Sequence, residues 1–232
     1  IIGCGSALHA GMVGKRVIEA MCRLRCTAEV ASEFRYENPI IGKKDMCIVI
    51  SQSGETADTL AAMRLAKQAG AFTIAIVNVV SSTIAREADG VLYTWAGPEI
   101  AVATTKAYSA QLAALYLISV KIARVRGLIS IGDERALCTE LQRLPECITE
   151  TLKCQPDMQR IATLYANRPS VFFLGRGLDY AAALEASLKL KEISYIHSEA
   201  YAAGELKHGT ISLIEDGTLV VALATQPALF EK

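Results

Sequence analysis

The chain lacks a net charge, since its 24 lysine and arginine residues equal its 24 aspartate and glutamate residues. A balanced charge provides no overall field to recruit nucleic acid or an anionic membrane. No apolar run is long enough to cross a membrane, and no basic-then-apolar leader opens the chain. The sequence therefore predicts neither a nucleic-acid partner nor a membrane partner, and binding must be sought at local sites.

Candidate metal ligands are few and scattered. None of the three histidines, His9, His197 and His208, clusters in sequence with the seven cysteines, and no cysteine pair has zinc-ribbon spacing. We therefore expect no metal site. The number of cysteines is odd and most lie in apolar or helical stretches, which indicates reduced thiols in a cytoplasmic protein.

What the chain does have is apolar residues, 52% of the total, which suffice for one large domain or two modest ones. In its first half, short β-branched runs alternate with longer helical patterns, which is typical of an α/β fold with a parallel sheet covered by helices. The expected strands are residues 1–3, 47–50, 72–77 and 91–95, and the expected helices are 10–22, 56–69 and 104–126. Residues 132–166 are expected to form a helical connector broken at Pro145 and Pro156.

After the connector, the sequence pattern of the first part repeats at a constant offset of 172 residues. The aligned pairs include Gly3 with Gly175, Gly5 with Gly177, Ala31 with Ala203, and Glu33 with Glu205. A repeat of this length predicts duplication of a whole domain. We expect a first domain over residues 1–130, a helical connector over 131–168, and an incomplete second domain over 169–232.

The segment SQSGETADT, which begins at Ser51, follows the apolar strand CIVI. In an open parallel sheet, ligands bind beyond the carboxyl ends of the strands, where unpaired N–H groups of the next helix attract anions. The cluster of Ser51, Gln52, Ser53 and Thr56 therefore indicates an anion site. The alternative is an ordinary helix cap.

The loop carries no Gly-Lys-Ser/Thr sequence, so it is not a nucleotide-triphosphate loop. A similar loop, from Gly3 to Ser6, follows the first strand, and we expect Ser6 to face the same ligand. Leu8 replaces the third glycine of a dinucleotide-binding fingerprint, so this loop does not predict a dinucleotide site either.

A second dense segment carries Glu185, Lys189 and Glu192, which share one face of a helix. A carboxylate beside a lysine in a cleft is a candidate general base. The alternative is a solvated helix face held by ion pairs. His208 is a candidate for proton transfer near neutral pH, or else a surface or capping histidine, and we expect His197 to be structural.

A family resemblance rests on the duplication and on four segments: SQSGETADT, EIAVATTKAY, FLGRG and ALEASLKLKEISYIHSEAYAAGELKHG. Together they resemble the isomerase half of the glutamine:fructose-6-phosphate aminotransferase family, the glucosamine-6-phosphate synthases. The resemblance covers essentially the whole chain. It implies two tandem sugar isomerase (SIS) domains, each a Rossmann-like αβα sandwich with a parallel sheet.

The resemblance implies that the sugar 6-phosphate is held by Ser6, Ser51, Gln52, Ser53 and Thr56, and that Val102 lines the sugar site. It implies that Glu192 moves a proton between C1 and C2, and that Lys189 stabilises charge. Glu185 would partner His208, which would be donated across a dimer interface to open the sugar ring.

The resemblance also implies an enzyme that makes glucosamine 6-phosphate from fructose 6-phosphate and glutamine, as a homodimer and without a cofactor or metal. The family's glutaminase domain and its Schiff-base lysine would lie outside residues 1–232. Ser6 stands where the family has threonine, and Ala7 where serine is frequent, which would alter that wall of the phosphate site.

Two other functions stay open. One is a different SIS sugar-phosphate deaminase or isomerase. The other is a non-catalytic SIS module that senses a phosphosugar, although a sensor would not need Glu185, Lys189, Glu192 and His208 together.

Overall fold

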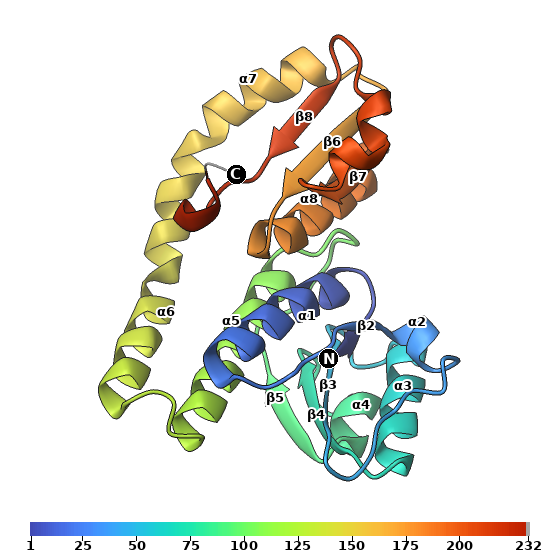
Figure 1. Ribbon diagram of the computed structural model, residues 1–232, viewed down its shortest axis with the longest axis vertical. Helices are drawn as coiled ribbons and strands as arrows, with labels where there is room; N and C mark the ends of the chain where they lie inside the picture. Colours follow the sequence, from blue (N-terminus) through green and yellow to red (C-terminus); the bar gives the residue numbers. More distant parts are fainter. Residues whose placement is uncertain (231–232) are drawn as a thin grey trace. The chain divides into compact units, whose positions relative to one another are not determined.

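A computed structural model describes residues 1–230 (Figure 1). The chain divides into two compact units, Ile1–Ile122 and Ala123–Lys232. Each unit holds its own parallel sheet, so the α/β class expected from the sequence is confirmed. The boundaries expected at residues 130 and 168 stay predictions.

The first unit contains a five-stranded parallel sheet with the order β2-β1-β3-β4-β5. Its strands are β1 (Ile2–Gly3), β2 (Glu29–Val30), β3 (Met46–Ser51), β4 (Phe72–Val77) and β5 (Gly90–Tyr93). The four strands expected from apolar runs are confirmed to within one or two residues. The short strand β2 was not expected, because neither a β-branched run nor an alternating pattern marks it.

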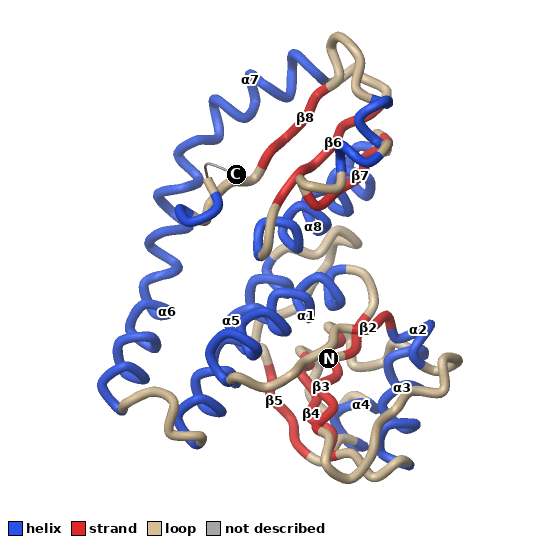
Figure 2. The backbone as a smooth tube through the Cα atoms, in the orientation of Figure 1, coloured by secondary structure: helices blue, strands red, loops and turns tan. Residues whose placement is uncertain are grey.

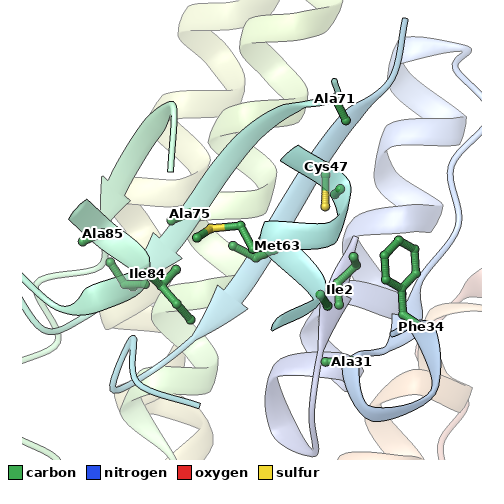
Figure 3. Close-up of a cluster of buried hydrophobic side chains, with 13 residues drawn as sticks. Ile2, Ala31, Phe34, Cys47, Met63, Ala71, Ala75, Ile84 and Ala85 are labelled. Carbon is green, nitrogen blue, oxygen red and sulfur yellow. The ribbon is translucent and has the colours of Figure 1, made fainter. Parts of the chain in front are cut away.

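Helices cover both faces of this sheet (Figures 1 and 2). They are α1 (Ser6–Val17) with the π-helical turn η1 (Ile18–Cys22), α2 (Ala31–Phe34), α3 (Ala57–Gln68), α4 (Thr83–Glu87) and α5 (Lys106–Val125). On one face, Phe34, Met63 and Ile84 from three helices pack with Cys47 of β3 in a buried apolar cluster (Figure 3). This core supports β3 from one face, and the carboxyl end of the strand lies at Ser51.

The second unit contains a three-stranded parallel sheet with the order β7-β6-β8. Its strands are β6 (Ser170–Gly175), β7 (His197–Ala202) and β8 (Leu219–Ala222), and its helices are α6 (Ile131–Thr151), α7 (Gln155–Tyr165) and α8 (Leu178–Ser194). Short 3₁₀ turns are η2 (Leu152–Cys154), η3 (Leu206–His208), η4 (Thr210–Leu213) and η5 (Pro227–Leu229). Helix α8 packs on the sheet through a core that includes Val171, Phe173 and Ala183.

The duplication predicted from the sequence is confirmed in the fold. Each copy begins with a strand, β1 or β6, that lies between the second and third strands of the copy. Helices α1 and α8 begin at Ser6 and Leu178, which are 172 residues apart. The residues before them adopt nearly the same conformation, with φ 53° and ψ −127° at Gly5 and φ 58° and ψ −120° at Gly177.

The expected break at Pro145 is wrong, because α6 continues through this residue. A proline removes one backbone hydrogen bond of a helix, and a helix of 21 residues keeps the others. The start of α6 is also fixed by a capping box, in which Ser130 and Asp133 exchange hydrogen bonds. Near Pro156 the helix does change, to the short turn η2 before α7 begins.

Candidate functional site

A pocket of about 290 Å³ opens in the first unit, at the carboxyl ends of its strands. Its lining includes every residue for which the sequence predicted ligand binding: Ser6, Ser51, Gln52, Ser53, Thr56 and Val102. Ser51 is buried and Val102 at the rim is 92% exposed. The other four, Ser6, Gln52, Ser53 and Thr56, are half-buried. The fold thus brings together segments that lie up to about a hundred residues apart.

The Ser51 loop is organised by its own hydroxyl groups. Ser51 Oγ lies 2.9 Å from Thr56 Oγ1 and accepts a hydrogen bond of 3.0 Å from the Gly54 N–H. Thr56 is the N-cap residue of α3, but its side chain makes no capping hydrogen bond. The alternative of an ordinary cap therefore does not describe Thr56, whose hydroxyl belongs to the loop and the pocket.

Gly54 is required at the turn of this loop. Its φ is +66°, a backbone conformation that residues other than glycine rarely adopt. A Cβ atom here would also lie 2.0 Å from Ser82 Oγ. The Gly54 carbonyl accepts from the Ile84 N–H at 3.0 Å, so the loop is anchored to the start of α4.

A second anchor comes from Glu55, whose Oε1 accepts from the Thr83 N–H at 2.7 Å. The hydrogen bonds from Thr83 hold the pKa of the exposed Glu55 carboxyl below its usual value. These contacts fix the direction of the loop before α3 begins at Ala57.

Four polar residues of the pocket were not among those six: Thr59, Glu99, Thr104 and Gln111. Glu99 Oε2 accepts from Thr104 Oγ1 at 2.9 Å and from the Ala107 N–H at 3.3 Å, so it fixes the segment that carries Val102 to the start of α5. Thr59 Oγ1 and Gln111 Oε1 are buried without a hydrogen-bond partner among the described residues. Buried polar atoms are ordinarily paired, so this wall can accept further hydrogen bonds.

No lysine or arginine occurs among the described residues that line the pocket. Attraction for an anion must therefore come from the first N–H groups of α3, where the helix dipole is positive, and from the hydroxyl groups. Such a site suits a phosphate group, whose oxygens accept several hydrogen bonds at once.

The second unit carries the predicted acid–base residues on α8. Lys189 Nζ lies 2.5 Å from Glu192 Oε2 and 3.5 Å from Glu185 Oε1. All three side chains are largely buried, Lys189 with 17% and Glu185 with 8% of the side chain exposed. A fully solvated helix face, the alternative weighed above, does not fit this burial. The arrangement can exchange a proton between a carboxylate and a ligand while the ammonium group balances the charge.

The two predicted histidine positions are both at the surface. His208 ends the turn η3 and is exposed. His197 Nε2 lies 3.5 Å from Glu199 Oε1 at the edge of the second sheet. The pairing of His208 with Glu185 stays a prediction.

Residues 1–230 contain no group of three or more His, Cys, Asp or Glu side chains that could hold a metal ion. All seven cysteines are free thiols in the structure. In the same part of the chain, no helix has the length and apolar character needed to cross a membrane.

Comparison with known proteins places these features in a family. A family model described as "SIS domain" matches residues 1–121 and 164–232. The glutamine--fructose-6-phosphate aminotransferases [isomerizing] of Caldanaerobacter subterraneus subsp. tengcongensis and Clostridium tetani are 58% and 57% identical over the whole chain. The chain spans 38% of the length of each of these relatives.

Solved structures similar to the chain include the following two. The C-terminal domain of glucosamine-fructose-6-phosphate aminotransferase from Francisella tularensis has a TM-score of 0.96 and 38% identity, covering 99% of this chain and 65% of that one. A glucosamine-6-phosphate deaminase from Thermotoga maritima has a TM-score of 0.82 and 26% identity, with 99% and 68% covered. With the family model matching most of its residues, the chain belongs to the SIS domain family.

Proposed function

We propose that the chain is the isomerase portion of an enzyme that makes glucosamine 6-phosphate from fructose 6-phosphate and glutamine. The observation that carries the proposal is the pocket at the Ser51 loop, whose lining includes all six residues expected to bind the sugar phosphate. The identity of 57–58% to aminotransferases, over the whole chain, supports the choice of reaction.

In this proposal the Ser51 loop binds the 6-phosphate. The hydroxyl groups of Ser51, Ser53 and Thr56 and the Gln52 side chain donate hydrogen bonds to the phosphate oxygens, with Ser6 from the neighbouring loop. The dipole of α3 contributes favourable electrostatics without a fixed positive charge. Val102 contributes to the rim on the sugar side.

Proton transfer is assigned to α8. Glu192 accepts a proton at C1 or C2 of the sugar and returns it to the neighbouring carbon. Lys189, already paired with Glu192 at 2.5 Å, stabilises negative charge that develops on the sugar oxygen. His208, partnered by Glu185, opens the sugar ring. This acid–base chemistry requires no cofactor.

The partners follow from the same proposal. Ammonia would come from a glutaminase domain elsewhere in the full-length protein, and the active form would be a cytoplasmic homodimer in which His208 is donated across the interface. A sugar-phosphate deaminase is the second candidate, supported by the structural similarity to the Thermotoga maritima enzyme. A phosphosugar sensor is less well supported, because it has no use for the α8 cluster.

The test is product formation by the full-length protein that contains this chain. With fructose 6-phosphate and glutamine, we expect glucosamine 6-phosphate and glutamate in equal amounts. Ammonia should replace glutamine at high concentration. Release of ammonia from glucosamine 6-phosphate, with no synthesis from glutamine, would favour the deaminase instead.

A further inference from the structure

The second copy of the repeat has its own counterpart of the Ser51 loop. At the offset of 172 residues, the segment that follows β8 corresponds to the loop that follows β3. Gly5 and Gly177, which precede the first helix of each copy, share nearly the same backbone angles. The two loops therefore lie at equivalent places, each at the carboxyl end of a strand that pairs with the first strand of its copy.

The chemistry of the two loops differs. Ser51 and Gln52 of the first copy correspond to Leu223 and Ala224, and of the hydroxyl-bearing residues only Ser53 has a hydroxyl counterpart, Thr225. On the first helix of each copy, α1 or α8, the change is the opposite, because the second copy gains a polar side chain. Ala7 lines the pocket of the first copy, whereas its counterpart in the second copy is Asp179.

Asp179 is buried, with 5% of the residue exposed, and its carboxylate is bound by the loop after β8. Oδ2 accepts from the Thr225 N–H at 2.9 Å, and Oδ1 accepts from the Thr225 hydroxyl. Gln226 also donates to Asp179, and its Nε2 reaches the Arg176 carbonyl at 2.7 Å. Burial acts to raise the pKa of Asp179, but the hydrogen bonds from Thr225 and Gln226 outweigh it and lower the pKa.

We infer that Asp179 is a built-in anion that fills the second copy's counterpart of the phosphate pocket. The loop after β8 keeps backbone and hydroxyl donors for an anion, and the chain supplies that anion itself. The Thr225 N–H and hydroxyl are thereby already engaged and are not open to a separate phosphate group. It follows that each chain binds one phosphosugar, at the Ser51 loop. This second conclusion also rests on the proposed function.

A simpler role for Asp179 would be that of an acidic residue in the first turn of a helix, where the dipole favours it. The structure argues against this as the whole account, because the donors to Asp179 lie 46 residues away, in another loop. Asp157 provides the contrast. It lies in the first turn of α7 and is exposed.

The test is rescue of Asp179→Gly by formate, in the full-length protein. The variant leaves the Thr225 donors without their acceptor and opens a space of carboxylate size. We expect its Tm to fall by about 5 °C or more, and formate at tens of millimolar to restore at least half of the loss. Asp157→Gly is the matched control. Its Tm should fall by less than that of Asp179→Gly, and formate should shift its Tm no more than it shifts that of the wild type.

Equal responses to formate in the two variants, or none in Asp179→Gly, would overturn the inference. If Asp179→Gly does not fold, Asp179→Ala serves instead, because it also removes the carboxylate and places there the residue type of its counterpart in the first copy, Ala7. Formate should then fail to shift the Thr225 amide resonance in the wild type and should shift it in the variant. Lack of that shift would count against the inference. Neither readout involves the Ser51 loop or a sugar, so failure here is distinct from failure of the proposed function.

Discussion

Ser51 Oγ lies 2.9 Å from Thr56 Oγ1, across the five-residue interval that joins the end of β3 to the start of α3. This contact closes the loop with side-chain oxygens instead of a helix cap. The same two hydroxyl groups line the pocket, so the residues that shape the loop are those proposed to bind the ligand.

The geometry at Gly54 predicts that Gly54→Ala damages the loop. The positive φ alone costs about 1–2 kcal/mol for a residue with a Cβ, and the clash with Ser82 adds to it. Gly127→Ala is the matched control, because Gly127 has a φ of +70° and no atom within 4 Å of its Cβ position. Urea denaturation should show a larger loss of unfolding free energy for Gly54→Ala, together with weaker binding of fructose 6-phosphate. Equal losses in the two variants would contradict the steric argument.

The assignment of proton transfer predicts the effect of Glu192→Gln. The amide keeps the size of the side chain but cannot take up a proton, so kcat should fall about a hundredfold or more while the affinity for fructose 6-phosphate stays near the wild-type value. Incorporation of solvent deuterium at C1 or C2 should fall in parallel. Glu140→Gln, on exposed α6, should change neither quantity. Unaltered deuterium exchange in Glu192→Gln would move the role to another residue.

Asp89 predicts an acid-sensitive contribution to the stability of the first unit. Its carboxylate pairs with Lys67 at 2.7 Å and accepts from the Thr73 N–H and hydroxyl, and these hydrogen bonds lower its pKa from 3.8 to about 2. Because the folded pKa is depressed, the stabilisation is complete above pH 3.8 and is lost as the pH falls towards 2. Asp89→Asn should therefore have a lower Tm than the wild type at pH 6, and the difference should shrink between pH 4 and pH 2. A Tm difference that does not change with pH would contradict the account. Asp216→Asn, at an exposed position, is the control and should have the Tm of the wild type at every pH.

Much of the fold followed from local patterns. The apolar runs before Ser51 and from Phe72 to Val77 are long enough to identify β3 and β4, and the repeat predicted a second unit that resembles the first. The strand β2 escaped prediction because it has only two residues, and β7 because polar residues interrupt any apolar run. Pairing with β1 and with β6 determines them instead. Local propensity contains no information on such pairing.

The candidate site could also be predicted only in part. The Ser51 loop is compact in sequence and could be recognised from its hydroxyl groups. Gln111 and Glu99 could not, because only the packing of α5 and the segment before it brings them to the pocket. The internal ligation of Asp179 was also beyond sequence reasoning, since its partner Thr225 is 46 residues away.

The most direct test combines one change in the protein with one change in the ligand. Wild type and Ser53→Ala, with exposed Ser109→Ala as control, are titrated calorimetrically with fructose 6-phosphate and with fructose. A hydrogen bond to a charged group contributes about 1.5–3 kcal/mol, so Ser53→Ala should bind fructose 6-phosphate roughly ten- to a hundredfold more weakly. Fructose should bind the wild type at least tenfold more weakly than its phosphate does, and Ser53→Ala should not weaken it further. Unchanged affinity of Ser53→Ala for fructose 6-phosphate, or equal binding of the two sugars by the wild type, would contradict a phosphate site at the Ser51 loop.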